Sequence, residues 1–205
     1  MYISHYYREE DLNKIADFVS EHDFATLVLA ENNIPVASHL LVDFQTEPDG
    51  TWLFNGHMAR ANPLWQKFDP EREVLLMFGG PSTYISPTWY NHLNVPTWNY
   101  IAVHLYGFPH LIDGGDELRN ILARLIRRYE PNSDYRMETL PSDFADKQMQ
   151  GVMGFQVRVT RVEASFKLSQ NRDDEDYTNI IQHLKERGDE QSVAIAEQMM
   201  KNRKV

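Results

Sequence analysis

The chain has 205 residues, a length that suits one large domain or one domain with a small appendage. It contains no cysteine, which excludes disulfides, thiolate metal sites and cysteine nucleophiles. Its formal net charge of −10 argues against nonspecific nucleic-acid binding, which depends on clustered Lys and Arg side chains. No apolar run reaches the roughly 20 residues of a membrane span, and the N-terminus lacks a signal-peptide pattern. We therefore expect a cytoplasmic protein with no membrane contact.

The first half of the chain is patterned as one helix followed mainly by short strands. Leu12, Ile15, Phe18 and Val19 recur at helical spacing and predict an amphipathic helix over residues 9–21. The patterns then predict strands at 24–30, 35–44 and 51–55, a short helix at 58–68 and a strand at 73–78 that ends at Gly79-Gly80-Pro81.

The second half alternates long strands with helices. In chain order we predict a strand at 97–106, a helix at 116–129 stopped by Pro131, a strand at 151–168, and helices at 177–187 and 189–202 hinged at Gly188. Strands joined mainly by hairpin turns predict an antiparallel barrel with helices at its edges, an α+β fold rich in β-structure. The polar run near residues 169–176 divides the chain into a barrel domain, 1–170, and a C-terminal helical extension, 171–205.

The region from Asn55 to Gly107 carries more aromatic, amide and hydroxyl groups than core packing requires. Aromatic walls with a few well-placed donors suit a flat ligand with polar edges. The sequence therefore points to a bound ring system.

Two common kinds of reactive site are not favoured. The histidines, among them His39, His57 and His104, show no HxH, HxxxH or HExxH spacing, so we expect no metal site. Ser38 and Ser86 do not lie in a GxSxG context, so a serine hydrolase is not expected. We assign no catalytic residue.

Two polar segments lie next to predicted strands, and each has two readings. The segment Gly56–Pro63 follows a strand and opens a helix, so its free amides and Arg60 could hold a phosphate. It could equally be a helix start with a surface arginine. The segment Lys167–Arg172 closes the last strand, either as a plain exit loop or as a ligand contact.

Four ordered motifs make the chain resemble the PaiB family of FMN-binding negative transcriptional regulators. They are Gly56-His-Met-Ala-Arg-Ala-Asn-Pro63, Gly80-Pro81 with Tyr84-Ile-Ser-Pro-Thr-Trp-Tyr90, Val95-Pro-Thr-Trp-Asn-Tyr100 and Phe166-Lys-Leu-Ser-Gln-Asn171. The resemblance covers nearly the whole chain. It implies a six-stranded antiparallel Greek-key split β-barrel with flanking helices and a C-terminal helical hairpin, similar to pyridoxamine-phosphate oxidase.

The resemblance also implies a homodimer that holds FMN at the subunit interface. The strand containing Ser38, His39 and Leu40 would flank the isoalloxazine ring, and the strand end Phe54–Gly56, with His57 and Arg60, would grip the ribityl chain and the phosphate. Asn55 within that strand end and Asn62 of the same motif are expected FMN contacts. The other motifs add Tyr84, Ser86, Trp98, Asn99, Lys167 and Gln170. A single cation, Arg60, stands where the oxidases use two, which would weaken the phosphate contact.

The resemblance implies repression of protease production and sporulation. Gly188 between two helices mimics a helix-turn-helix, but Asp189, Glu190 and Glu197 stand where DNA recognition needs cations, so we expect indirect action. One alternative is a flavin-dependent oxidoreductase acting on a small substrate. Another is a flavin-free interaction module with a decayed pocket.

Overall fold

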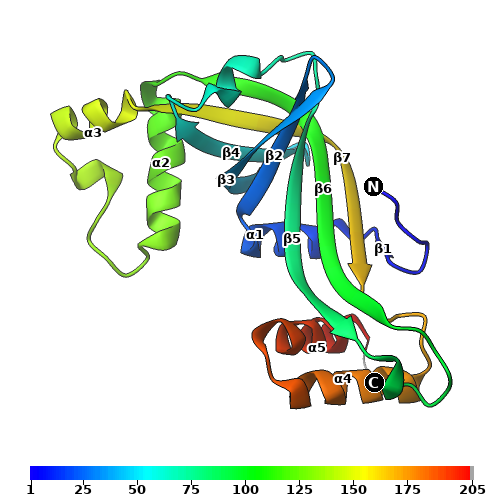
Figure 1. Cartoon of the computed structure of the whole chain (residues 1–205). Coiled ribbons are helices and arrows are strands. Elements are labelled where there is room, and N and C mark those ends of the chain that lie inside the picture. Colours follow the sequence, from blue (N-terminus) through cyan, green and yellow to red (C-terminus); the bar gives the residue numbers. More distant parts are fainter. Residues whose placement is uncertain (204–205) are drawn as a thin grey trace. The chain divides into compact units, whose positions relative to one another are not determined.

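The computed structural model describes residues 1–203 and contains one seven-stranded sheet with helices (Figure 1). The elements are β1 (Arg8–Glu9), α1 (Leu12–Glu21), β2 (Phe24–Glu31), β3 (Ile34–Thr46), β4 (Trp52–Ala59), η1 (Pro63–Lys67), β5 (Val74–Ile85), η2 (Pro87–Trp89), β6 (Thr97–Ile112), α2 (Gly115–Tyr129), η3 (Met137–Thr139), α3 (Ser142–Met149), β7 (Val152–Lys167), α4 (Asp174–Arg187) and α5 (Glu190–Asn202). The strand order is β1-β7-β4-β3-β2-β5-β6, and β6 pairs again with β7. Six strands therefore close the predicted barrel, and the two-residue β1 is added outside β7.

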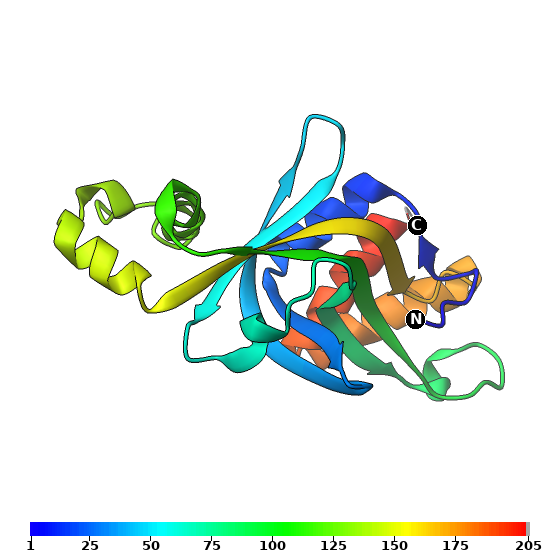
Figure 2. The same cartoon turned by 90° about the horizontal axis from the view of Figure 1, so that it is seen from above.

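Short turns connect β2 to β3 and β3 to β4. Asn32 and Asn33 have φ values of 50° and 63°, and Glu31 pairs with Ile34 across them. Asparagine tolerates positive φ, which the two-residue turn of a hairpin needs. The connection between β3 and β4 forms a projecting hairpin (Figure 2). These turns fix the register, so that alternate residues face the core.

The segment after residue 55 differs from the prediction. β4 continues to Ala59, because Gly56 pairs with Phe155 and Ala59 pairs with Val152. The expected helix over 58–68 is reduced to η1, a 3₁₀ helix that begins with Pro63. The prediction of a strand-to-helix junction with free amides at Gly56 is therefore wrong, since residues 56–59 belong to the sheet.

Two other boundaries were also wrong, and one helix was not predicted. β5 runs through Gly79-Gly80-Pro81 to Ile85, and β6 extends to Ile112. Glycine and proline are tolerated in a strand where ladder bonds or side-chain packing are not required. The helix α3 has eight residues, too few for its apolar spacing to stand out.

The described chain forms two compact units. Unit 1 comprises residues 1–16, 79–103 and 163–205, and unit 2 comprises 17–78 and 104–162. β5, β6 and β7 each contribute residues to both units. The predicted division into a barrel domain, 1–170, and a C-terminal extension, 171–205, is a different division of the chain. It stays a prediction.

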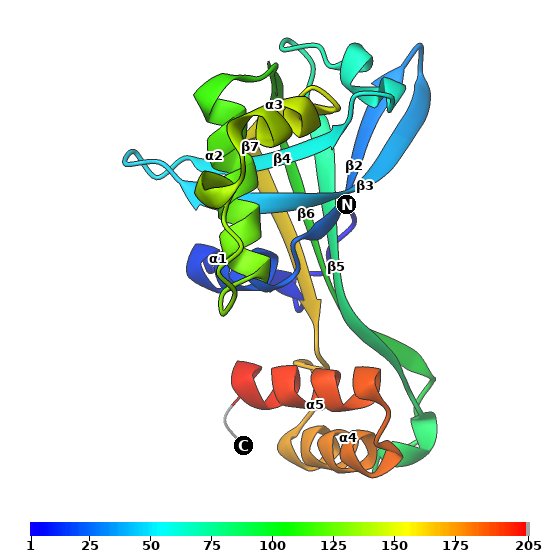
Figure 3. The same ribbon diagram turned by 90° about the vertical axis from the view of Figure 1, so that its left-hand side faces the viewer.

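The C-terminal helical hairpin of unit 1 is confirmed, with α4 and α5 packed against each other (Figures 1 and 3). Gly188 ends α4 with a φ of 72°, a conformation that glycine adopts without strain. Ile195, Ala196 and Met199 of α5 are completely buried. The apolar face of α5 is therefore part of the core of unit 1.

Unit 2 carries a second apolar cluster around α2. Leu118, Ile121 and Leu125 of α2 are buried together with Ala145 and Met149 of α3. The two helices lie near each other in the views of Figures 2 and 3. This cluster covers part of unit 2 with helices and leaves the pocket described below.

Candidate functional site

The predicted site residues fall in both units. Unit 2 contains Ser38, His39, Leu40, Asn55, Gly56, His57, Arg60 and Asn62, and unit 1 contains Tyr84, Ser86, Trp98, Asn99, Lys167 and Gln170. Each group has its own set of contacts.

Asn62 links β3 to the start of η1. Its Nδ2 donates to Ser38 Oγ at 3.1 Å, and its Oδ1 accepts from Leu64 N at 3.0 Å. The second bond is an N-cap, which satisfies one of the free amides at a helix start. The structure thus brings Ser38 and Asn62 together, with both side chains engaged inside the protein.

His39 lies on the other face of β3 from Ser38 and the buried Leu40, as the two-residue period of a strand requires. Its Nδ1 is 2.9 Å from Thr26 Oγ1. Its ring stacks against the exposed Phe24, with centroids 6.0 Å apart. His39 and Phe24 therefore form an accessible aromatic pair, while Leu40 belongs to the core.

Asn55 and Gly56 are held tightly within the sheet. Asn55 is 2% exposed, donates to Gln45 Oε1 at 3.0 Å and accepts from Gln156 Nε2 at 2.9 Å. A Cβ on Gly56 would lie 2.6 Å from Phe155 Cζ and 2.9 Å from the carbonyl oxygen of Leu41. The hydrogen bonds of Asn55 and the close backbone approach at Gly56 therefore explain both residues by the packing of the sheet.

His57 lines an apolar pocket of about 360 Å³ in unit 2. The other lining residues come from α2, α3, β7 and the segment around η3: Leu122, Leu125, Ile126, Tyr135, Met137, Leu140, Phe144, Ala145, Gln148, Met149 and Val152. His57 Nδ1 is buried without a hydrogen-bond partner among residues 1–203. Burial lowers the pKa of this imidazole, because the charged form loses its hydration. His57 is thus a neutral side chain beside an apolar space.

Arg60 is anchored to its own unit. Its Nε donates to the carbonyl oxygen of Gln150 at 3.0 Å, and its Nη2 donates to that of Val152 at 3.2 Å. The same Nη2 forms an ion pair with Asp113, whose pKa the guanidinium lowers. Most of the donors that a phosphate would use are therefore engaged within the chain.

Two exposed aromatic side chains meet in unit 1. The rings of Tyr84 and Trp98 are 6.4 Å apart at an interplanar angle of 73°, and the residues are 40% and 54% exposed. Ser86 caps η2, accepting from Thr88 N at 3.3 Å. The Tyr84–Trp98 pair offers an apolar wall that is not covered by the described residues of its unit.

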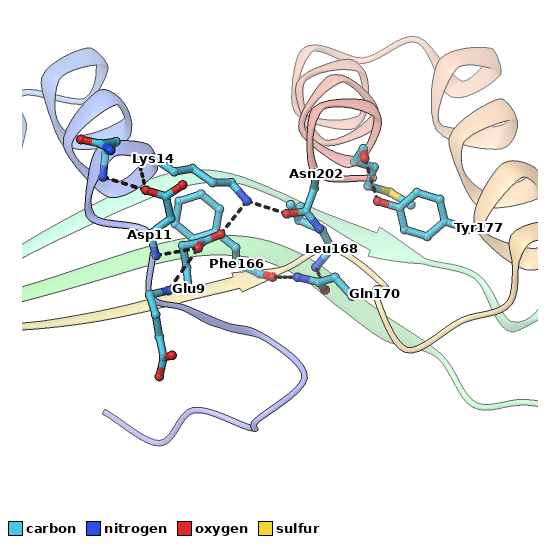
Figure 4. Close-up of polar contacts among 11 residues, drawn as sticks. Glu9, Asp11, Lys14, Phe166, Leu168, Gln170, Tyr177 and Asn202 are labelled. Atoms are coloured by element: carbon cyan, nitrogen blue, oxygen red, sulfur yellow. Dashed lines mark hydrogen bonds and ion pairs between the residues drawn. The ribbon is translucent and has the colours of Figure 1, made fainter. Parts of the chain in front are cut away.

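The side chains of Asn99 in β6 and Gln170 after β7 form hydrogen bonds within the chain. Asn99 is buried and exchanges hydrogen bonds with Ser169 Oγ at 3.0 and 3.1 Å. Gln170 accepts from Leu168 N at 2.8 Å and donates to the carbonyl oxygen of Phe166 (Figure 4). These contacts explain both amides as supports for the loop after β7.

Lys167 has a different environment. Its Nζ donates to Thr97 Oγ1 at 2.5 Å and lies 5.6 Å from the ring centroid of Tyr7 and 6.0 Å from that of Tyr100. Burial lowers the pKa of this amine, and the positive charge of Arg172 lowers it further. Lys167 is the predicted site residue whose charge is least compensated by its surroundings.

Residues 1–161 match the protein family described as "Putative FMN-binding domain". The chain belongs to this FMN-binding-domain family. It is also 37% identical over 201 residues to "Protease synthase and sporulation protein PAI 2" of Bacillus subtilis, covering 97% of this chain and 96% of that protein. The resemblance found in the four motifs is thereby confirmed over almost the full length.

Solved structures with the same fold confirm the split-barrel class. The flavocytochrome Anf3 of Azotobacter vinelandii has a TM-score of 0.60 and 15% identity, covering 85% of this chain and 76% of that one. The FAD and heme binding protein of Mycobacterium smegmatis has a TM-score of 0.61 and 15% identity, covering 83% of this chain and 78% of that one. At this identity the likeness establishes the fold alone.

Within residues 1–203, no three His, Cys, Asp or Glu side chains gather as a metal site would require. No helix in the same range has the length and apolarity needed to cross a membrane.

The sequence placed Arg172 in the polar segment after Lys167, but it did not identify Tyr7 as a neighbour of Lys167. Tyr7 lies in the N-terminal segment, whose strand β1 is only two residues long and gives no periodic signal. Only the folded chain brings Tyr7 to the end of β7.

Proposed function

We propose that this protein is a homodimer that binds FMN at its subunit interface and takes part in repressing protease production and sporulation. The observation that carries the proposal is the family match over residues 1–161, together with 37% identity to a protease synthase and sporulation protein. FMN binding is inferred from the family description, and the link to protease production and sporulation is inferred from the name of the relative.

The surface chemistry of unit 1 fits a flavin. FMN has a flat apolar ring with polar edges and a phosphate, so it needs an aromatic wall and a cation. The Tyr84–Trp98 pair supplies an exposed wall, and Lys167 supplies a cation without an acidic partner among residues 1–203. When bound, FMN supplies redox chemistry and a visible absorbance band.

The proposed FMN contacts remain those of the four motifs and the strand before them. They are Ser38, His39, Leu40, Asn55, Gly56, His57, Arg60, Asn62, Tyr84, Ser86, Trp98, Asn99, Lys167 and Gln170. We infer two kinds of role among them. Asn55, Gly56, Asn99 and Gln170 would shape the backbone around the ligand, since their side-chain positions are taken by internal contacts. Trp98, Tyr84, His39 and Lys167 would contact it directly.

We propose that any action on gene expression is indirect and takes place in the cytoplasm. A recognition helix needs Lys and Arg on its exposed face. Instead, α5 begins with Asp189 as N-cap and Glu190 in its first turn, and it buries its apolar face against α4. A mobility-shift assay at low salt tests this point, and specific DNA binding by the purified protein would contradict it.

FMN titration of the purified protein, followed by flavin fluorescence, tests the proposal directly. We expect saturable quenching with one FMN per protomer. Trp98→Ala should weaken binding about tenfold by removing the aromatic wall, whereas Tyr2→Ala, which removes another exposed ring of unit 1, should not. Absence of quenching by wild-type protein would reject the proposal.

The alternative function, a flavin-dependent oxidoreductase acting on a small substrate, differs in one measurable property. Flavin-loaded protein would then oxidise NADH or NADPH in repeated turnovers, faster than the same concentration of free FMN. A single reduction without turnover would favour the regulatory role.

A further inference from the structure

A cluster of two cations and three phenol rings lies in unit 1 at the end of β7. Lys167 is the last residue of β7, and Arg172 lies in the loop that leads to α4. Lys167 Nζ is 5.6 and 6.0 Å from the ring centroids of Tyr7 and Tyr100, and the Arg172 guanidinium is 4.7 Å from that of Tyr90. We call these five residues the Lys167–Arg172 cluster.

The two cations of the cluster have no acidic partner. Within residues 1–203, neither Lys167 nor Arg172 forms an ion pair, whereas Arg60, Arg124, Arg158 and many other cations do. Burial lowers the pKa of Lys167, and the positive charge of Arg172 lowers it further. Two like charges held together in this way are stabilised when an anion lies between them.

Asp176, in the first turn of α4, contacts the segment that follows Tyr90. Asp176 is completely buried, accepts from Asn91 N at 2.8 Å and lies 3.3 Å from His92 Nδ1. Asp176 therefore contacts the Asn91–His92 segment, and among residues 1–203 it forms no ion pair with Arg172.

The phenol groups add hydrogen-bond donors to the cluster. Tyr90 is 8% exposed, and its Oη is buried without a hydrogen-bond partner among the described residues. Burying a hydroxyl group without a partner costs free energy. Tyr7 donates to Asn171 Oδ1 at 3.2 Å, a long bond that an approaching acceptor could replace.

We propose that the Lys167–Arg172 cluster is a subsite for an oxyanion, a phosphate or carboxylate group carried by a ligand. The oxyanion accepts hydrogen bonds from Lys167 Nζ, the Arg172 guanidinium and the Tyr90 hydroxyl, while the rings border the body of the ligand. Its source is either the phosphate of FMN, in which case the inference rests on the proposed function, or the acidic group of a second ligand.

The test uses the full-length protein in phosphate-free buffer with three probes. FMN and riboflavin, which lacks the phosphate, are titrated by flavin fluorescence, and inorganic phosphate is titrated by calorimetry. The variants are Lys167→Met and Arg172→Gln, which remove one charge each, and Arg172→Lys, which keeps the charge. Lys201→Met, an exposed lysine of α5, is the matched control, and thermal unfolding confirms that every variant is folded.

Two outcomes support the subsite and identify the source of the oxyanion. If the neutral variants weaken FMN binding at least tenfold while riboflavin binding changes less than twofold, the oxyanion is the phosphate of FMN. If FMN binding is unchanged and the heat of phosphate binding is lost, the oxyanion belongs to a second ligand. In both cases Arg172→Lys should retain most of the binding and Lys201→Met all of it.

One outcome overturns the proposal. If folded Lys167→Met and Arg172→Gln bind FMN and inorganic phosphate as the wild type does, or if the wild type binds neither, the cluster has no anion site. A different result would reject the proposed FMN binding while leaving the anion subsite in place. A wild-type protein that binds no flavin, yet loses phosphate binding in both neutral variants, retains the subsite and loses the FMN assignment.

Discussion

The segment 55–62 of unit 2 and the Lys167–Arg172 cluster of unit 1 are both rich in polar groups, but they differ in what those groups contact. Asn55, Arg60 and Asn62 use most of their hydrogen-bonding capacity on the chain itself. Lys167 and Arg172 have no acidic partner among residues 1–203. A polar motif can thus serve the fold or a ligand, and its internal partners distinguish the two.

The largest effect expected within the first region is on stability, at Gly56. A Cβ there would overlap the ring of Phe155 and the backbone of Leu41, so Gly56→Ala should lower the free energy of unfolding by about 1–3 kcal/mol. Gly79→Ala is the matched control, because a Cβ at Gly79 meets no atom within 4 Å. Chemical denaturation measures both. Equal stability of the two variants would show that β4 and β7 can separate at Gly56.

The next effect concerns Arg60. Removing its guanidinium leaves the carbonyl oxygens of Gln150 and Val152 and the carboxylate of Asp113 without this donor, so Arg60→Ala should cost about 1–2 kcal/mol. Arg119→Ala, which breaks a single exposed ion pair with Asp146, should cost less than about 1 kcal/mol. If Arg60→Ala unfolds like Arg119→Ala, the anchoring role of Arg60 is refuted.

In the second region, removing a cation should not lower the free energy of unfolding. Burial and the charge of Arg172 lower the pKa of Lys167, so the unfolded chain binds this proton more strongly than the folded one. The contribution to stability therefore rises with pH from the lowered folded pKa to the ordinary value of 10.5. Lys167→Met should leave stability near pH 7 unchanged or raise it by less than about 1 kcal/mol. A clear loss would indicate that Lys167 serves the fold.

The smallest effect is expected at His57. Burial lowers its pKa below the ordinary value of 6.5, so the folded protein stays neutral there while the unfolded chain takes up a proton as pH falls through that value. Stability from this group is complete above the unfolded pKa and decreases below it. His57→Phe should reduce the drop in thermal midpoint between about pH 7.5 and 5.5, relative to His5→Gln. An identical drop in the two variants would contradict a neutral His57.

Periodic apolar patterns predicted most elements of the fold, including α2, β7 and the hairpin of α4 and α5. They did not predict the ends of β4 and β5, where strand pairing with distant partners overrides local signals. Gly56 to Ala59 resembles a helix start in sequence, yet pairing with residues 152–155 keeps it extended. Long-range pairing of this kind leaves no trace in a local window.

The candidate site could be predicted as a set of motifs but not as a set of contacts. The sequence identified the segment Lys167–Arg172 but not Tyr7, which only folding brings beside Lys167. It also gave Arg60 a free guanidinium, because the acceptors at Gln150 and Val152 are far away in the sequence. Residue types are visible in a sequence, but their partners are not.

The most direct test of the difference between the two regions compares the FMN dissociation constants of Lys167→Met and Arg60→Ala with that of the wild type. We predict a loss of at least tenfold for Lys167→Met, because its cation is available to the ligand. For Arg60→Ala we predict a change of less than threefold, because its donors are engaged within unit 2. The reverse ranking, with Arg60→Ala abolishing binding and Lys167→Met binding normally, would contradict the account.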